Sequence, residues 1–176
     1  MPTRRQFLKV GIASGAVLAG AGWLDLRREP APAPGLTGLD ARGKAIVAAL
    51  APVVLEGALP EAPPARAQAL AEVVAAFDRA VSGLSPAVQE EIRQLFALLG
   101  LAAGRFIVAG VRSSWAESTP DEVSGFLRRW RGSRWALLRA GYQALTQLLQ
   151  AAWYGNPGSW ERIGYPGPPA LGERAA

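Results

Sequence analysis

The chain has 176 residues and a formal net charge of +5, with 19 basic against 14 acidic side chains and neither cysteine nor histidine. Without thiolate or imidazole groups it cannot form a disulfide, bind zinc or haem through those ligands, or build a Ser-His or Cys-His nucleophile pair. The acidic residues are scattered rather than clustered. We therefore expect no catalytic residue, no cofactor site and no metal site in this chain.

Residues 1–24 have the pattern of an export signal. The segment Thr3 to Lys9 reads TRRQFLK, and a weakly apolar run rich in Gly and Ala follows from Val10 to Leu24. This pattern resembles the twin-arginine (Tat) signal, an address read by the Tat translocase, which exports proteins already folded. The resemblance implies a periplasmic protein. The expected recognition residues are Arg4, Arg5, Phe7, Leu8 and Lys9.

Two fates of this leader remain open. Ala19-Gly20-Ala21 fits the small-x-small pattern of a signal cleavage site, which predicts cleavage after Ala21. The alternative is that Phe7 to Leu26 is retained as a membrane anchor, although a spanning helix needs roughly 20 mostly apolar residues and Val10 to Leu24 is shorter. Membrane association is therefore expected either through the leader or through a larger complex.

Residues 25–37 predict a tether between the leader and the folded part. From Arg27 the sequence reads RREPAPAPGLT, and alternating Ala and Pro favour an extended, polyproline-like spacer over a helix. Residues 38–153 are expected to form a helical domain. Residues 154–176, rich in Pro and Gly, are expected to form an irregular tail.

Two amphipathic patterns begin the domain. The first, from about Asp40 to Leu55, has apolar residues at helical spacing, and Pro52 is a point where the helix kinks or splits. The second, from about Pro64 to Val81, has one apolar stripe and ends at Ser82-Gly83. Its solvent-facing side is expected to carry Arg66, Glu72, Asp78 and Arg79.

A third helix is predicted from Ser85 and Pro86, which suit the N-cap and the first helical position. Beyond Gly100, the run Leu101 to Val111 is almost uniformly apolar. It predicts a buried continuation of the helix, bent near Gly100 or Gly104, and a short buried strand is the alternative.

The clearest helix start is Thr119-Pro120-Asp121-Glu122, which fits a capping box with proline at the first position. The last long helix is expected from about Arg134 to Trp153. Its two apolar faces indicate that it either lies centrally or meets a partner. With no strand expected, the predicted fold class is all-α, a single bundle of about five helices.

The segment Ser113 to Arg139 interleaves tryptophans with arginines. The tryptophans either lie in the core beneath solvated arginines, or form a docking face, since Trp and Arg dominate binding hot spots. In the second interpretation Trp130 and Arg131 contact a partner. Nucleic acid is not an expected partner of an exported protein, although such a pattern can bind it, and anionic lipid is a weaker candidate.

The tail places Trp153, Tyr154, Trp160 and Tyr165 among turn-forming residues, so their rings need something to pack against. They either fold back on the bundle or lie across another protein. Extended Pro-rich segments dock with a low ordering cost, which applies to the end of this run. We therefore include Pro166 and Pro168 among the candidate contacts.

Two of these stretches resemble a known family. The run from Trp153-Tyr154 through Trp160 to Ile163-Gly164-Tyr165-Pro166-Gly167-Pro168 is similar to the C-terminal motif of the gluconate 2-dehydrogenase subunit 3 family. The stretch FLRRWRGS, residues 126–133, resembles that family's FL-x-x-W-R-x-S segment. The family comprises small, Tat-exported γ subunits of membrane-associated, FAD-dependent sugar and alcohol dehydrogenases.

The resemblance implies a non-catalytic subunit that binds a flavoprotein of the glucose–methanol–choline type, aids its maturation and supplies its export signal. FAD then belongs to the partner, and a cytochrome c subunit is a further candidate partner. The expected partner-binding residues are Trp130, Arg131, Trp153, Tyr154, Trp160, Tyr165, Pro166 and Pro168. Two alternatives remain: a membrane-tethered exported adaptor for an unrelated partner, and a free-standing exported enzyme.

Overall fold

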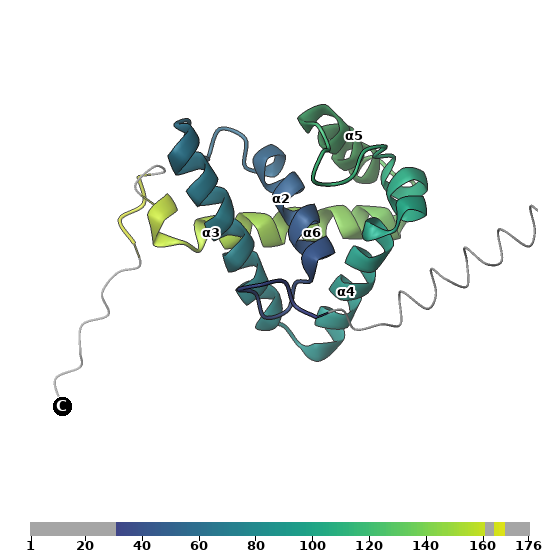
Figure 1. Cartoon of the computed structure of the whole chain (residues 1–176), viewed down its shortest axis with the longest axis horizontal. Helices are drawn as coiled ribbons and strands as arrows, with labels where there is room; N and C mark the ends of the chain where they lie inside the picture. The colour runs from purple at the N-terminus through teal and green to yellow at the C-terminus, as the bar shows by residue number, and fades with distance from the viewer. Residues whose placement is uncertain (1–30, 161–163, 168–176) are drawn as a thin grey trace, which may run out of the picture.

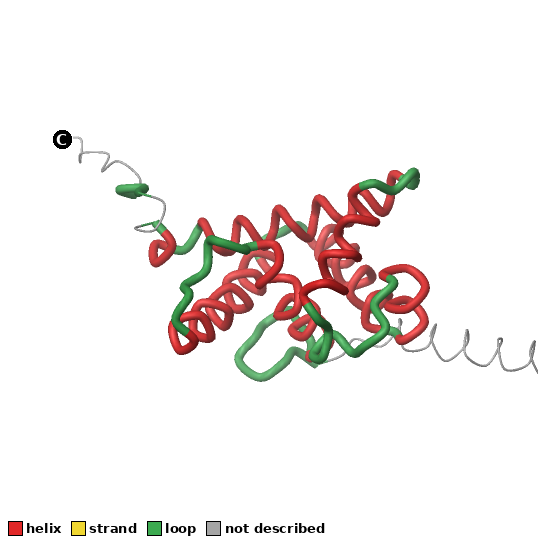
Figure 2. Tube along the Cα trace, turned by 90° about the horizontal axis from the view of Figure 1, so that it is seen from above, coloured by secondary structure: helices red, strands yellow, loops and turns green. Residues whose placement is uncertain are grey.

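The computed structural model describes residues 31–160 and 164–167, and these form helices and no strand (Figures 1 and 2). This confirms the predicted all-α bundle of about five helices. The elements in chain order are α2 (Ala41–Val54), α3 (Pro63–Ser82), α4 (Pro86–Gly100), the π-helix η1 (Gly104–Ala109), α5 (Pro120–Arg131), α6 (Ala136–Tyr154) and the 3-10 turn η2 (Pro157–Ser159). Within the same residues, no helix has both the length and the apolar character that crossing a membrane requires.

Helix α2 is the centre of the bundle, because it packs against each of the other four α-helices. Its apolar stripe is fully enclosed: Ile46, Val47 and Leu50 have no exposed surface. Asp40 caps the helix, its carboxylate accepting a hydrogen bond of 2.7 Å from the backbone N–H of Gly43. Pro52 lies in the last turn and the helix continues to Val54, so the predicted split does not occur.

Helix α6, with 19 residues, packs against α2, α3 and α5. In Figure 1 it runs behind α3 and α2 from one side of the molecule to the other. At 1.5 Å per residue its axis is about 28 Å long. Its central position explains why a second apolar face is tolerated: Leu148 packs against the core. Leu137, by contrast, remains 81% exposed.

The helix starts follow the expected local chemistry in part. Before α5, the hydroxyl of Thr119 accepts from the N–H of Glu122, and the Glu122 carboxylate accepts from the N–H of Thr119, so the predicted capping box is confirmed. Before α4, Ser85 and Pro86 take the expected positions, but the Ser85 side chain makes no capping hydrogen bond.

The prediction that Asp78 faces solvent is wrong. Asp78 is only 2% exposed, and its carboxylate accepts hydrogen bonds from the backbone N–H groups of Thr37 (2.7 Å), Gly38 (2.9 Å) and Leu39 (2.7 Å). The hydroxyl of Thr37 donates a further bond of 2.8 Å. The polar partners come from a segment some forty positions earlier, which a single-helix pattern cannot reveal. We call this arrangement the Asp78 latch.

Residues 31–37 pack against the domain beside the latch, although the sequence predicts them to be part of an extended spacer. The N–H of Ala33 donates to the carbonyl of Leu39 at 2.8 Å, and the Ala33 side chain is buried. These last residues of the expected tether therefore belong to the folded domain, while residues 25–30 lie outside the described part.

For residues 101–111 the predicted helix with a bend near Gly100 is confirmed, but its predicted burial is wrong. Helix α4 ends at Gly100, Leu101 is extended, and η1 follows with Phe106 59% and Ile107 77% exposed. The turn depends on Gly104, because a Cβ there would lie 1.9 Å from the carbonyl oxygen of Leu98. A uniformly apolar run has no periodicity from which this close approach of two backbone segments could be predicted.

Candidate docking surfaces

The aromatic residues of the Ser113 to Arg139 segment mostly build the core. Phe126 lies between Trp115 and Trp130, with ring centroids 5.7 and 4.7 Å away and both pairs edge-on. Each indole N–H is satisfied by a backbone carbonyl, since Trp115 donates to Leu99 at 2.8 Å and Trp130 to Val108 at 3.0 Å. Both side chains are thereby fixed inside the domain.

Helix α6 packs against the edge of the Trp130 ring that lies opposite the indole nitrogen. A Cβ added at Gly141 would lie 2.6 Å from Trp130 Cζ3, so only glycine lets α6 approach this closely. Trp130 is 2% and Trp153 3% exposed. Two of the expected partner-binding residues therefore lie in the core, where their rings offer no contact surface to a partner.

The arginines of the same segment have different surroundings. Arg129 donates to the carbonyl of Ala109, which ties α5 to the end of η1. Arg139 donates to the carbonyl of Ser133 at 2.7 Å. The guanidinium carbon of Arg134 lies 5.3 Å from the centre of the Trp135 ring, a cation–π contact. Arg134 and Arg139 thus lie at the turn between α5 and α6, whereas Arg129 joins α5 to η1.

The remaining two arginines, Arg128 and Arg131, line a cavity of about 410 Å³ between the end of α2, α5 and α6. We call it the arginine groove. Its other polar walls come from one side of α6: Tyr142, Gln143, Thr146, Gln147 and Gln150. No acidic side chain lines it. The groove therefore offers two guanidinium groups and several amides to an acidic or amide-bearing surface.

One face of α6 leads from this groove to the tail. Gln143, Gln147, Gln150 and Tyr154 are spaced by four, three and four residues, so they share a face of the helix. All four are exposed. We call them, with the described tail residues, the α6–tail face.

The described part of the tail folds back on itself. The indole N–H of Trp160 donates to the carbonyl of Tyr154 at 2.8 Å, and its ring stands edge-on to Tyr165 with centroids 5.3 Å apart. Asn156 reaches α3, donating to the Glu72 carboxylate at 3.2 Å. Tyr154 and Tyr165 nevertheless remain 42% and 45% exposed, and Pro166 is exposed. The tail thus packs locally and keeps aromatic surface free.

A second exposed apolar region lies at the other end of α6. Among the described residues, four large apolar side chains are more than half exposed: Phe106, Ile107, Trp135 and Leu137. They come from η1 and from the start of α6, the two segments that meet at Trp130. We call these four residues, with Arg134, the corner surface.

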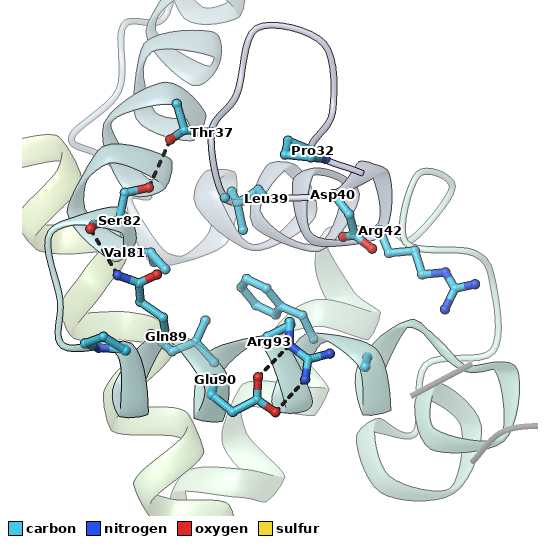
Figure 3. A pocket seen from close by; sticks show the side chains of 15 residues that line it. Pro32, Thr37, Leu39, Asp40, Arg42, Val81, Ser82, Gln89, Glu90 and Arg93 are labelled. Atoms are coloured by element: carbon cyan, nitrogen blue, oxygen red, sulfur yellow. Dashed lines mark hydrogen bonds and ion pairs between the residues drawn. The ribbon is translucent and has the colours of Figure 1, made fainter. Parts of the chain in front are cut away.

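Another cavity, of about 400 Å³, lies where the latch segment meets α2, α3 and α4 (Figure 3). Its charges are largely matched within the wall, since Arg93 pairs with Glu90. Thr37 and Gln89 both bond to Ser82 across the cavity (Figure 3). The arrangement stabilises the junction of these segments, and its internal pairing leaves little charge for an ionic ligand.

Three carboxylates have lowered pKa values: Glu90, through hydrogen bonds from Arg93 and Gln94 on the same helix, and Asp78 and Glu122. Burial raises the pKa of Asp78, but the hydrogen bonds from Thr37, Leu39 and Gly38 more than offset it, so the pKa lies below its usual value. The hydroxyl of Ser113, with backbone N–H groups of the same region, lowers the pKa of Glu122. All three groups are held ionised by structural hydrogen bonds.

Several sequence-predicted residues lie outside the described residues. These are Arg4, Arg5, Phe7, Leu8 and Lys9, the cleavage position after Ala21, and Pro168. Across residues 31–160 and 164–167, no group of three or more acidic side chains is arranged as a metal site. The comparisons with family models, curated proteins and solved structures each found no match to this chain.

Sequence reasoning missed the arginine groove and the corner surface. The 143, 147, 150, 154 spacing of exposed residues on α6 could have been found from the helical period alone. The exposure of Phe106 and Ile107 could not, because it depends on the turn at Gly104 and on the hydrogen bond that Trp130 donates to the carbonyl of Val108.

Proposed function

We propose that this chain is the non-catalytic small subunit of an exported, FAD-dependent dehydrogenase of the glucose–methanol–choline type. It binds the flavoprotein, aids its maturation and supplies the Tat signal that carries both to the periplasm. The observation that carries this proposal is the order of three resemblances along one chain: the TRRQFLK leader, the FLRRWRGS segment and the aromatic, Pro-rich tail.

The packing of the described residues supports a docking role for the α6–tail face. Tyr154 and Tyr165 keep large exposed fractions although their neighbours are ordered around them. Arg131 lines the arginine groove beside the same helix. A rim of arginine and glutamine next to exposed tyrosines is the composition that protein interfaces favour. We therefore assign the flavoprotein contact to Arg131, Tyr154, Trp160, Tyr165 and Pro166.

The export role is tested by deleting residues 1–22 and fractionating cells that also make the flavoprotein. We expect the flavoprotein to remain in the cytoplasm, because it depends on this chain's leader. Normal amounts of flavoprotein in the periplasm would contradict the escort role. A lysine pair in place of Arg4 and Arg5 is the matched control, because it removes the motif and leaves the apolar run in place.

The docking role is tested by pull-down of the flavoprotein with Trp160→Ala and Tyr165→Ala. We expect recovery to fall about tenfold, as for loss of an aromatic hot spot. The Trp135→Ala variant, changed at the other end of α6, is the matched control and should recover the flavoprotein normally. Undiminished recovery by both tail variants, with unchanged circular dichroism, would remove the tail from the interface.

A further inference from the structure

The corner surface combines exposed apolar side chains with positive charge. Its four apolar members range from 59% to 81% exposed, so nothing in the described domain covers them. Two exposed arginines, Arg134 and Arg139, flank Trp135 and Leu137 in the sequence, and the segments 104–109 and 132–139 hold no acidic residue. The surface is therefore both apolar and basic.

Trp130 brings the two halves of this surface together. Its indole N–H is bonded to the carbonyl of Val108, directly after Ile107. The other edge of its ring faces Gly141, and Leu137 lies one turn earlier on the same face of α6. The segments that carry Ile107 and Leu137 consequently adjoin opposite edges of one buried ring.

We propose that the corner surface docks on an anionic lipid bilayer. Trp, Phe, Leu and Ile side chains enter the boundary between headgroups and acyl chains, while arginines pair with lipid phosphates just above it. The stacking of Arg134 on Trp135 keeps a cation and an indole at the same depth. This combination matches a bilayer surface more closely than a uniformly apolar patch would.

Charge argues against a second copy of this chain as the occupant. A symmetric contact would bring Arg134 and Arg139 of the two copies close together, and like charges at close range disfavour association. The flavoprotein of the proposed function is assigned to the α6–tail face, whose Tyr154 lies about 26 Å further along α6 than Leu137. The bilayer proposal does not depend on that assignment, because it concerns the isolated chain.

The test uses the absence of cysteine from the sequence. The full chain carrying Leu137→Cys is labelled with an environment-sensitive fluorophore and mixed with phosphatidylcholine vesicles, with or without phosphatidylglycerol. Because the probe reports only its own surroundings, the apolar leader does not confuse the result. Ala65→Cys, at an exposed position in the first turn of α3, carries the same label as the matched control.

We expect a blue shift at position 137 with phosphatidylglycerol vesicles, little shift with phosphatidylcholine alone and none at position 65. In the labelled Leu137→Cys chain, Trp135→Ala should weaken the apparent vesicle affinity about tenfold, and Arg134→Gln about fivefold, as for one juxtamembrane cation. No shift at position 137, or an equal shift with both kinds of vesicle, would overturn the proposal. The proposal would also be overturned if the probe at position 137 shifted when the flavoprotein was added but not when vesicles were added.

Discussion

The indole nitrogen of Trp130 donates a hydrogen bond of 3.0 Å to the carbonyl oxygen of Val108. Through this bond a residue in the last turn of α5 fixes the end of η1, twenty-two positions earlier. The same ring accepts the close approach of α6 at Gly141. One side chain thus joins three elements, and it determines which apolar residues remain outside.

Replacing Trp130 by Phe should destabilise the domain by about 2 kcal/mol, because the Val108 carbonyl loses its partner and a void is left beside α6. Urea unfolding followed by circular dichroism measures this change. The exposed Trp135, replaced by Phe, should alter the free energy of unfolding by less than about 0.5 kcal/mol. Equal effects of the two substitutions would show that Trp130 does not join these elements.

Replacing Gly141 by Ala should destabilise the domain by about 1–3 kcal/mol through overpacking, although alanine is the better helix former. The new Cβ would lie 2.6 Å from the Trp130 ring. The control is Gly83→Ala at the C-cap of α3, where the nearest atoms are 3.6 Å away. That variant should be neutral or slightly more stable. A stabilised Gly141→Ala protein would contradict the contact.

Replacing Asp78 by Asn should destabilise the domain by about 1–3 kcal/mol at neutral pH, since an amide cannot accept all the bonds of the Asp78 latch. The exposed Glu91→Gln change in α4 is the matched control and should have little effect. Thermal or urea unfolding of the two variants beside the unmodified chain decides the matter.

The Asp78 latch also predicts a pH dependence. Its hydrogen bonds hold the pKa of Asp78 below the value in the unfolded chain, which is about 3.9. The ionised group therefore stabilises the fold above about pH 4. This contribution is lost as the pH falls through the folded-state pKa. The stability difference between the unmodified chain and Asp78→Asn should be constant near neutrality and shrink below about pH 4. A difference independent of pH would contradict the ionised latch.

Replacing Thr119 by Ala should cost about 1 kcal/mol, because it removes one half of the capping box at α5. Ser85→Ala before α4 is the matched control, since the Ser85 side chain makes no capping bond. The Ser85 variant should be close to neutral in urea unfolding. An equal loss of unfolding free energy in Thr119→Ala and Ser85→Ala would contradict the prediction that only Thr119 stabilises its helix as a cap.

The sequence predicts the helices well where local chemistry decides them. Thr119, Pro120 and Glu122 mark the start of α5 through bonds within one turn, and Ser82-Gly83 marks the end of α3. The buried stripe of α2 follows from helical spacing alone. These features need no knowledge of the rest of the chain, and they suffice for the fold class.

The predictions are wrong where contacts with a segment distant in the sequence determine whether a residue is buried. Asp78 reads as a solvent-facing residue of α3 until the N–H groups of residues 37–39 are placed against it. Phe106 and Ile107 read as core until Trp130 takes the space beside Val108. Trp130 is a residue type that is common in binding hot spots, and its burial becomes clear only from the packing of η1 and α6 around its ring. Candidate surfaces are therefore harder to predict than the helices that carry them.

The Asp78 latch has a mechanical consequence. One carboxylate on α3 receives the backbone of three consecutive residues just ahead of α2. A pulling force applied from the N-terminal side therefore reaches α3 before it can unwind the first turn of α2. Several hydrogen bonds must then break together rather than one after another. The latch therefore makes the folded domain resist unravelling when force is applied at its N-terminal end.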